Sequence, residues 1–193
     1  VLTTFIVLLT LFISKIHIRS KHKLYYAMVF LLESSVLGIL CAKDMFLFFV
    51  FWELSLIPVY FLVSQWGNSE ARRAAIKFTI TSFVANMFLF FGMLILYYYN
   101  FAVSNVLTAN IESLNMDEKI YPLWFQVTVF INFLIGFMLR IPFVPFHNWY
   151  PDIQSKAAAP VNILMSGIIL NTGLYGLIRF NMQVFPEIFK LFA

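Results

Sequence analysis

Long apolar runs separated by short polar segments make up most of the chain. Runs such as MFLFFVFW are apolar on every side, and the period-two alternation of a membrane β-barrel is absent. The predicted membrane-spanning segments are Val1–Ser14, Leu24–Ala42, Met45–Gln65, Ala74–Tyr99, Tyr121–Phe146 and Ala157–Phe180. All except the first reach roughly the 20 residues that a helical crossing needs. The pattern therefore predicts one transmembrane domain, an all-α polytopic membrane protein of about six helices, with an interfacial tail over 181–193.

Two prolines interrupt the fifth predicted segment. Pro142 and Pro145 lack a backbone N–H and disfavour helix in the residue before each. We therefore expect the helix over 121–146 to be broken near this point. Because the first segment is short and no Met precedes it, we also expect the chain to be an internal piece of a longer protein.

Composition excludes most soluble classes. Charged residues form 11% of the chain, against about a quarter in soluble domains. The single cysteine, Cys41, cannot hold an iron–sulfur cluster, and no zinc, haem or nucleotide-binding pattern occurs. A net charge of +4 does not indicate nucleic-acid binding here, because basic residues in such a chain mainly set its orientation.

The charges of the connecting segments alternate. Lys15, Arg72 and Lys156 mark three connections on one side, the last within a loop predicted over 147–156. The long connection over 100–119, on the other side, is acidic. Its acidic residues are Glu112, Asp117 and Glu118. By the positive-inside rule, the basic side faces the cytoplasm, stroma or matrix.

Two glutamates lie inside predicted spans. Glu33 and Glu53 stand 11 residues before and 9 residues after Asp44, so on antiparallel helices both lie roughly 14–17 Å from the same membrane face. Buried carboxylates cost free energy and are usually functional, which favours a proton relay for both residues. The alternative is a protonated glutamate that hydrogen-bonds within the bundle.

Two basic residues lie near the ends of apolar runs. Lys77 either extends to the membrane interface or pairs with Glu53 on the preceding helix. Arg140 directly precedes the predicted break and either lines a hydrated pocket or marks the helix end.

Two further polar residues are candidates for a proton path. His147 lies beside Trp149 and Tyr150, so it is either a proton carrier or part of an interfacial aromatic belt. Asn171 falls near mid-depth of the last segment, where it either joins helices or lines a water path.

Several of these residues belong to longer motifs. The segments LLESSVLGILCAKDMFLFFVFWELSLIPVYFLVSQWG, AAIKF, IPFVPFHNWYPD and APVNILMSGIILNTGLYGLIRFN follow one another along the chain. Together they resemble the antiporter-like chain 4 (M-type) family of proton-pumping NADH–quinone oxidoreductase, respiratory complex I, and of its photosynthetic relative. The resemblance runs almost from end to end and implies the antiporter-like fold, with this chain covering about the third to eighth helices.

The resemblance assigns roles to most of the candidate residues. Glu53 matches the key glutamate of the fifth helix, Glu33 a fourth-helix glutamate, and Lys77 a sixth-helix lysine. Arg140 occupies the position of the pumping lysine on the broken seventh helix, and Asn171 that of an eighth-helix lysine.

The chain departs from the family pattern at several positions. Arginine stays protonated and asparagine carries no exchangeable charge, so Arg140 and Asn171 cannot act as lysines do. Gln154 stands where the family usually has a second histidine, and the loop proline is displaced to Pro160.

The resemblance also implies an activity, which is proton translocation coupled to quinone reduction within the assembled complex. NADH, FMN, iron–sulfur clusters and quinone would bind other subunits, and this chain itself would hold no cofactor. Its partners would be other membrane-arm subunits and lipids, including cardiolipin. The alternatives are a non-pumping structural subunit of the same arm and a subunit of a related cation/proton antiporter complex.

The location follows less directly from the residues. Heavy use of Phe, Tyr, Ile and Asn favours the mitochondrial inner membrane, with a bacterial plasma membrane or a thylakoid membrane as alternatives.

Overall fold

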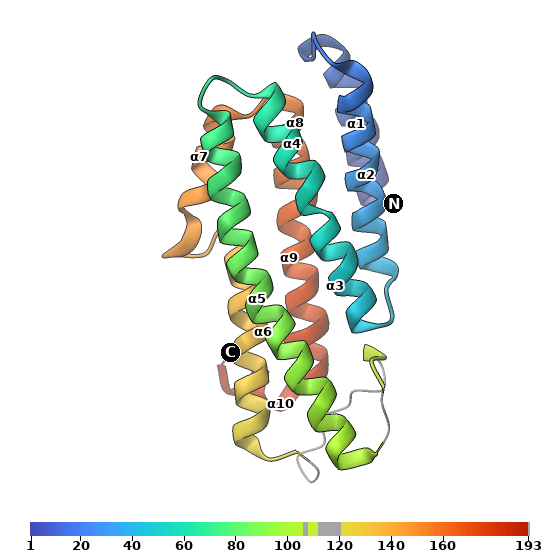
Figure 1. Ribbon diagram of the computed structural model, residues 1–193, viewed down its shortest axis with the longest axis vertical. Helices are drawn as coiled ribbons and strands as arrows, with labels where there is room; N and C mark the ends of the chain where they lie inside the picture. Colours follow the sequence, from blue (N-terminus) through green and yellow to red (C-terminus); the bar gives the residue numbers. More distant parts are fainter. Residues whose placement is uncertain (106–107, 112–120, 193) are drawn as a thin grey trace.

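A computed structural model describes residues 1–105, 108–111 and 121–192 of the chain (Figure 1). Regular structure within these ranges is helical, apart from an isolated bridge between Asp44 and Asn110. The helices are α1 (Leu2–His17), α2 (His22–Cys41), α3 (Met45–Leu54), α4 (Leu56–Trp66), α5 (Ala71–Ser104), α6 (Leu123–Arg140), α7 (Trp149–Lys156), α8 (Ala159–Leu164), α9 (Leu170–Gly176) and α10 (Pro186–Phe192). Short π-helical stretches, Met165–Ile169 and Leu177–Met182, continue the axis of α8 and α9.

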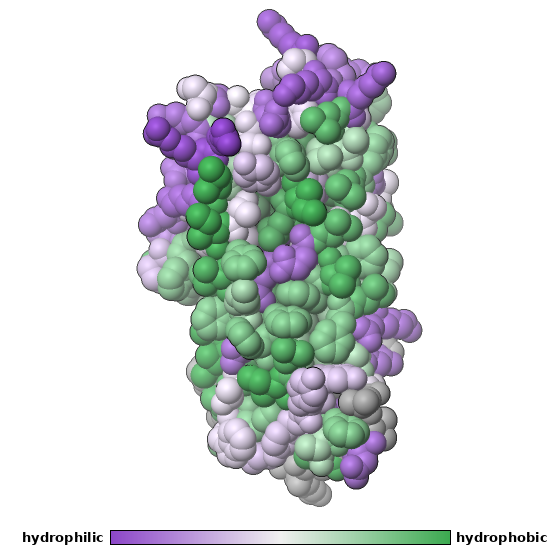
Figure 2. All heavy atoms as spheres, in the orientation of Figure 1, coloured by the Kyte–Doolittle hydropathy of each residue, from purple (hydrophilic) through white to green (hydrophobic). Residues whose placement is uncertain are grey.

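Five helical segments of the described residues are long and apolar enough to cross a membrane. They are His22–Cys41, Met45–Trp66, Ala71–Val103, Leu123–Arg140 and Ala159–Met182. The shorter apolar helix Leu2–His17 lies beside them. On the face shown in Figure 2, apolar residues predominate across the middle of the molecule, and hydrophilic residues gather towards its two ends. These features confirm the all-α polytopic membrane fold.

The basic connections meet at one end of the bundle. Trp66 Nε1 donates to the Ser20 carbonyl at 2.9 Å, and Lys21 Nζ donates to Gln65 Oε1 at 2.8 Å. The Asn68 N–H donates to the Lys156 carbonyl at 2.9 Å, which joins the α4–α5 and α7–α8 connections. We call this end the basic end. It brings together the connections that the charge pattern of the sequence placed on one side of the membrane.

The opposite end holds the α2–α3 turn. Asp44 caps α3, since its Oδ1 accepts from the N–H groups of Phe46 and Leu47 at 2.8 and 3.0 Å. The N–H of Met45 donates to the Ala109 carbonyl at 2.9 Å, which ties the end of the α5–α6 connection to the same turn. The acidic residues predicted for that connection, Glu112, Asp117 and Glu118, lie outside the described residues.

The break predicted from Pro142 and Pro145 is present. Helix α6 ends at Arg140, a non-helical stretch and a single 3₁₀ turn (Phe146–Asn148) follow, and α7 then leads to the basic end. The prediction of a loop over 147–156 is wrong, because Trp149–Lys156 is helical. Trp149 and Ile153 bury one side of this short helix, and such packing stabilises a helix that would not form alone.

Two apolar clusters form the core. The basic-end cluster joins α1, α2, α4, α5, α7 and α8, and its larger members include Tyr25, Leu62, Phe78, Trp149 and Leu164. The opposite-end cluster joins α3, α5, α6 and the last helices, and its larger members include Phe48, Trp52, Phe133, Phe137, Phe180 and Phe185. The candidate site lies where these clusters meet.

Candidate proton-transfer site

A fully buried arginine lies between the two clusters. Arg140 is 0% exposed, and its Cζ lies 4.8 Å from the ring centre of Trp52 and 5.7 Å from that of Phe78. One ring belongs to the opposite-end cluster and the other to the basic-end cluster. Such contacts stabilise a desolvated cation, although they replace only part of its lost hydration. Arg140 therefore does not simply extend from the helix end to solvent.

The polar partner of Arg140 comes from the junction of α3 and α4. Pro58 has no N–H to offer the Leu54 carbonyl, so one backbone hydrogen bond is missing where α3 passes into α4 at Ser55, whose own backbone stays helical. Arg140 Nη2 donates to Ser55 Oγ at 2.7 Å, and Ser55 Oγ donates to the Trp52 carbonyl at 2.6 Å. Arg140 Nε and Nη1 are buried without a hydrogen-bond partner among the described residues.

Glu53 lies next to the junction of α3 and α4 and lines a pocket of about 240 Å³. The other lining residues are Phe49, Phe83, Asn86, Met87 and Phe90. Among the described residues no ion pair joins the Glu53 carboxylate directly to Arg140, yet the two charges interact electrostatically within the bundle. A half-buried carboxylate beside a pocket and near a fixed cation is suited to exchanging a proton.

Trp52, Phe78 and Ser55 surround the Arg140 guanidinium, and we call them the cage around Arg140. Asn86 connects the pocket beside Glu53 to this cage. Its Oδ1 accepts a hydrogen bond from Trp52 Nε1 at 2.8 Å. Its Nδ2 is buried beside the Glu53 carboxylate, which is the acceptor available to it in the pocket wall. Glu53, Asn86, Trp52, Ser55 and Arg140 thus form one contiguous group, which we call the site.

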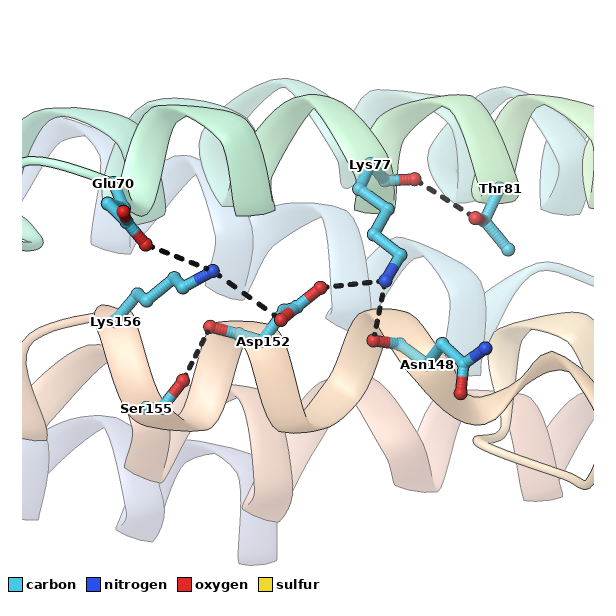
Figure 3. A network of polar contacts seen from close by, with 7 residues as sticks. All are labelled: Glu70, Lys77, Thr81, Asn148, Asp152, Ser155 and Lys156. Carbon is cyan, nitrogen blue, oxygen red and sulfur yellow. Dashed lines mark hydrogen bonds and ion pairs between the residues drawn. The ribbon is translucent and has the colours of Figure 1, made fainter.

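Lys77 does not join this group, and the pairing with Glu53 considered from the sequence is wrong. Its Nζ lies 2.7 Å from Asp152 Oδ2 and donates to the Asn148 carbonyl at 3.0 Å (Figure 3). Lys156 Nζ lies 3.5 Å from both Asp152 Oδ1 and Glu70 Oε2, which extends the network to the start of α5. The network ties α7, the helix after the break, to α5.

The hydrogen bond from Lys77 lowers the pKa of the Asp152 carboxyl below its usual range. The nearby charges of Lys77 and Lys156 act in the same direction, because each favours the carboxylate form. Asp152 is therefore ionised at neutral pH and serves as a fixed anion.

Glu33 and Asn171 lie outside the site. Glu33 is partly exposed on α2 and forms no hydrogen bond or ion pair with the described residues. Asn171 lies on an exposed face of α9 and donates to the Gly167 carbonyl of its own helical segment at 2.7 Å. Gly173, two residues later, faces Ile141 of the break, so Asn171 points to a different side of the helix. Their roles in a proton path stay predictions.

His147 lies in the 3₁₀ turn after the break, with a buried Nδ1 that has no hydrogen-bond partner among the described residues. A role as proton carrier stays a prediction for this residue also. No group of three His, Cys, Asp or Glu side chains in the described part of the chain is placed to hold a metal ion.

Sequence reasoning missed Ser55, Asn86, Trp52 and the Lys77–Asp152 pair. Pro58 was a usable signal for the irregular junction at Ser55, since a proline removes the backbone hydrogen bond to the residue four before it. Asn86 was also visible, as a lone amide within an uncharged apolar run. Nothing local indicated Asp152, which is 75 residues from Lys77.

The comparisons with known proteins agree with this architecture. Residues 42–192 match the family model described as NADH:quinone oxidoreductase/Mrp antiporter, TM. Chain 4 of an NAD(P)H-quinone oxidoreductase from Thermosynechococcus vestitus is 37% identical over 176 residues, which are 91% of this chain and 32% of the relative. A chain 4 from Picosynechococcus sp. is 35% identical over 192 residues, which are 100% of this chain and 34% of the relative. The chain thus spans about a third of the length of these relatives.

Solved structures share the fold at lower identity. Respiratory complex I from Thermus thermophilus with bound NADH contains a chain with a TM-score of 0.74 and 22% identity, over 98% of this chain and 40% of that one. The Mrp complex from Dietzia sp. gives a TM-score of 0.72 and 22% identity, over 83% of this chain and 17% of the other.

Proposed function

The chain belongs to the NADH:quinone oxidoreductase/Mrp antiporter transmembrane family, and from this premise we propose that it forms part of a membrane-arm subunit that translocates protons in an NAD(P)H–quinone oxidoreductase. Its relatives named as chain 4 of NAD(P)H-quinone oxidoreductase support this choice within the family. The observation that carries the proposal is the site itself, where a glutamate and a fully buried arginine share the interior of a membrane bundle.

In this proposal Glu53 is the residue that takes up and releases a proton. The pocket beside Glu53 leaves space at the carboxylate for a water molecule or a neighbouring proton-carrying group, and Asn86 offers a donor that stabilises its ionised form. Arg140 keeps its charge throughout, because a guanidinium is not deprotonated in proteins. It therefore supplies a constant field instead of exchanging a proton as a lysine would.

The remaining candidates take subordinate roles. Lys77 acts through Asp152 and fixes the helix that follows the break, so it does not act on Glu53 by direct contact. We keep His147, Glu33 and Asn171 as proposed members of a longer proton path. The unpartnered Nδ1 of His147 and the intramembrane position of Glu33 support their inclusion.

The proposed partners are the rest of the same subunit and the neighbouring membrane-arm subunits. NADH, FMN, iron–sulfur clusters and quinone are proposed to bind elsewhere in the complex, and lipids including cardiolipin to cover the apolar band. The protein is a membrane protein. Because its relatives named above are cyanobacterial, they give no support to the mitochondrial location expected from composition, and we propose a thylakoid or bacterial plasma membrane.

The test is Glu53→Gln in the assembled complex, with protons translocated per NADH oxidised as the readout. Glutamine keeps the size and hydrogen-bonding capacity of the side chain but cannot exchange a proton, so we expect this ratio to fall. Glu187→Gln is the matched control, since Glu187 is a surface residue of α10 paired with Lys190 at 2.7 Å. An unchanged ratio in the Glu53 variant refutes the proposal.

Two observations favour other functions. Arg140 replaces the lysine that the family resemblance assigns to pumping, and Asn171 replaces a lysine of the eighth helix, which favours a structural subunit that no longer transports protons. In that case Glu53→Gln leaves the ratio unchanged while the complex still assembles. The family description and the fold shared with an Mrp complex favour a cation/proton antiporter. Sodium-dependent proton exchange in vesicles without NADH oxidation would select that function.

A further inference from the structure

Ser55 provides the hydrogen bond that holds the Arg140 guanidinium. Nη2 donates to Ser55 Oγ at 2.7 Å, while Nε and Nη1 have no partner among the described residues. Both residues are 0% exposed. A buried cation with one such bond depends strongly on it, because an unsatisfied charged donor is costly in a low dielectric.

The hydroxyl of Ser55 is itself fixed in direction. It donates its proton to the Trp52 carbonyl at 2.6 Å, so its lone pairs are left to accept from Arg140. The ring of Trp52 lies against the guanidinium, with 4.8 Å between Cζ and the ring centre. Trp52 therefore packs against the face of the guanidinium, and Ser55 binds its edge through Nη2.

Trp52 directly precedes Glu53 in the sequence, and Ser55 follows it by two residues. The two residues that hold Arg140 thus belong to the same turn as the acid proposed to exchange the proton. Arg140 belongs to another helix and is 85 residues from Ser55 along the chain. The hydrogen bond consequently fixes the placement of a cation on α6 relative to an acid on α3.

We propose that Ser55 is a positioning residue, which sets the distance of the permanent charge of Arg140 from Glu53 and through it the proton transfer by Glu53. The proposal rests on the proposed function of Glu53. Because a guanidinium stays charged, only its position can change its electrostatic effect on Glu53. Charge interactions depend steeply on distance in a low dielectric, so a small displacement of Arg140 is sufficient.

The experiment compares three serine variants in the assembled complex. Ser55→Ala removes the acceptor, Ser55→Thr keeps a hydroxyl at the same position, and Ser35→Ala is the matched control. Ser35 is also 0% exposed and donates to a carbonyl of its own helix, that of Leu31, at 2.7 Å, but it has no contact with Arg140. Any general effect of losing a buried hydroxyl appears in this control.

Two readouts are taken for each variant. The first is modification of Arg140 by phenylglyoxal, measured by mass spectrometry, because a released guanidinium turns towards water and becomes reactive. The second is protons translocated per NADH oxidised. We expect Ser55→Ala to raise the modification severalfold and to lower the proton ratio towards that of Glu53→Gln, and we expect Ser55→Thr and Ser35→Ala to resemble the parent in both.

Each other outcome overturns the inference. Equal modification of Arg140 in all variants shows that Ser55 does not hold the guanidinium. Raised modification with an unchanged proton ratio, in a complex where Glu53→Gln lowers that ratio, shows that the position of Arg140 does not govern transfer. If Glu53→Gln leaves the ratio unchanged, the proposed function fails, and the role of Ser55 in transfer fails with it, while the modification data still decide the contact.

Discussion

Replacement of Gly176 by alanine should destabilise the packing of the last long helix against α6. A Cβ at this position would lie 2.2 Å from Cε1 and 2.6 Å from Cδ1 of Phe137. Ordinary contacts begin at 3.4 Å, so the ring would have to retreat by about 1.2 Å, the difference between 3.4 and 2.2 Å. Phe137 is fully buried and packs against Trp52, with 5.5 Å between ring centres, and against Phe180, with 5.7 Å.

The expected loss of stability in Gly176→Ala follows from two opposing contributions to the free energy of unfolding. Overpacking a filled core costs about 1–3 kcal/mol, and an overlap this large with a confined ring belongs near the upper value. Alanine is a better helix former than glycine by about 1 kcal/mol, which offsets part of that cost. A net destabilisation of about 2 kcal/mol remains. Because Phe137 supports Trp52, the change should also disturb the cage around Arg140.

The measurement is the temperature at which the purified complex loses half its proton transport. Gly167→Ala is the matched control, because a Cβ there would lie 3.0 Å from the Cδ1 at the flexible end of Ile6. We expect Gly176→Ala to lower this temperature clearly and Gly167→Ala to leave it nearly unchanged. If the two variants behave alike, the packing argument around Phe137 is wrong.

Two further predictions concern the ion pair of Lys77 with Asp152 and the junction of α3 and α4. Asp152→Asn should destabilise by no more than about 1 kcal/mol at pH 7, because the Lys77 and Asp152 side chains are 45% and 35% exposed and water screens their attraction. The pKa of Asp152 is lowered in the folded protein, so the stabilisation is complete above the ordinary aspartate pKa of about 3.9 and is lost as pH falls through the lowered value. Heat-inactivation rates of variant and parent should therefore differ by a constant factor from pH 7 to 5, and a difference that disappears in this range contradicts the assignment. Pro58→Ala restores an N–H for the Leu54 carbonyl and should tighten the α3–α4 junction, shifting the Ser55 hydroxyl relative to Arg140 and lowering protons translocated per NADH oxidised, whereas Pro186→Ala at the first position of α10 should leave that ratio unchanged. An unchanged ratio in Pro58→Ala would show that the missing backbone hydrogen bond at this junction does not support the site.

The sequence by itself determined the elements and their orientation. Apolar runs long enough to cross a bilayer must form helices, because their backbone groups have no other partners there. The alternation of basic and acidic connections determined which ends lie together, and the prolines at 142 and 145 determined where the broken helix ends. These properties are local, since each depends on a single run of residues and its solvent.

Only the tertiary structure decided which polar side chains meet. Lys77 and Glu53 lie on neighbouring segments, yet Lys77 pairs with Asp152, because α7, which follows the break after Arg140, packs against α5. Arg140 reaches Ser55 because the end of α6 packs beside the junction of α3 and α4. Hydropathy defines a helix but leaves its rotation and its neighbours open, and a uniformly apolar helix has no polar face to fix them. The packing of whole helices therefore chose the partners of these charges.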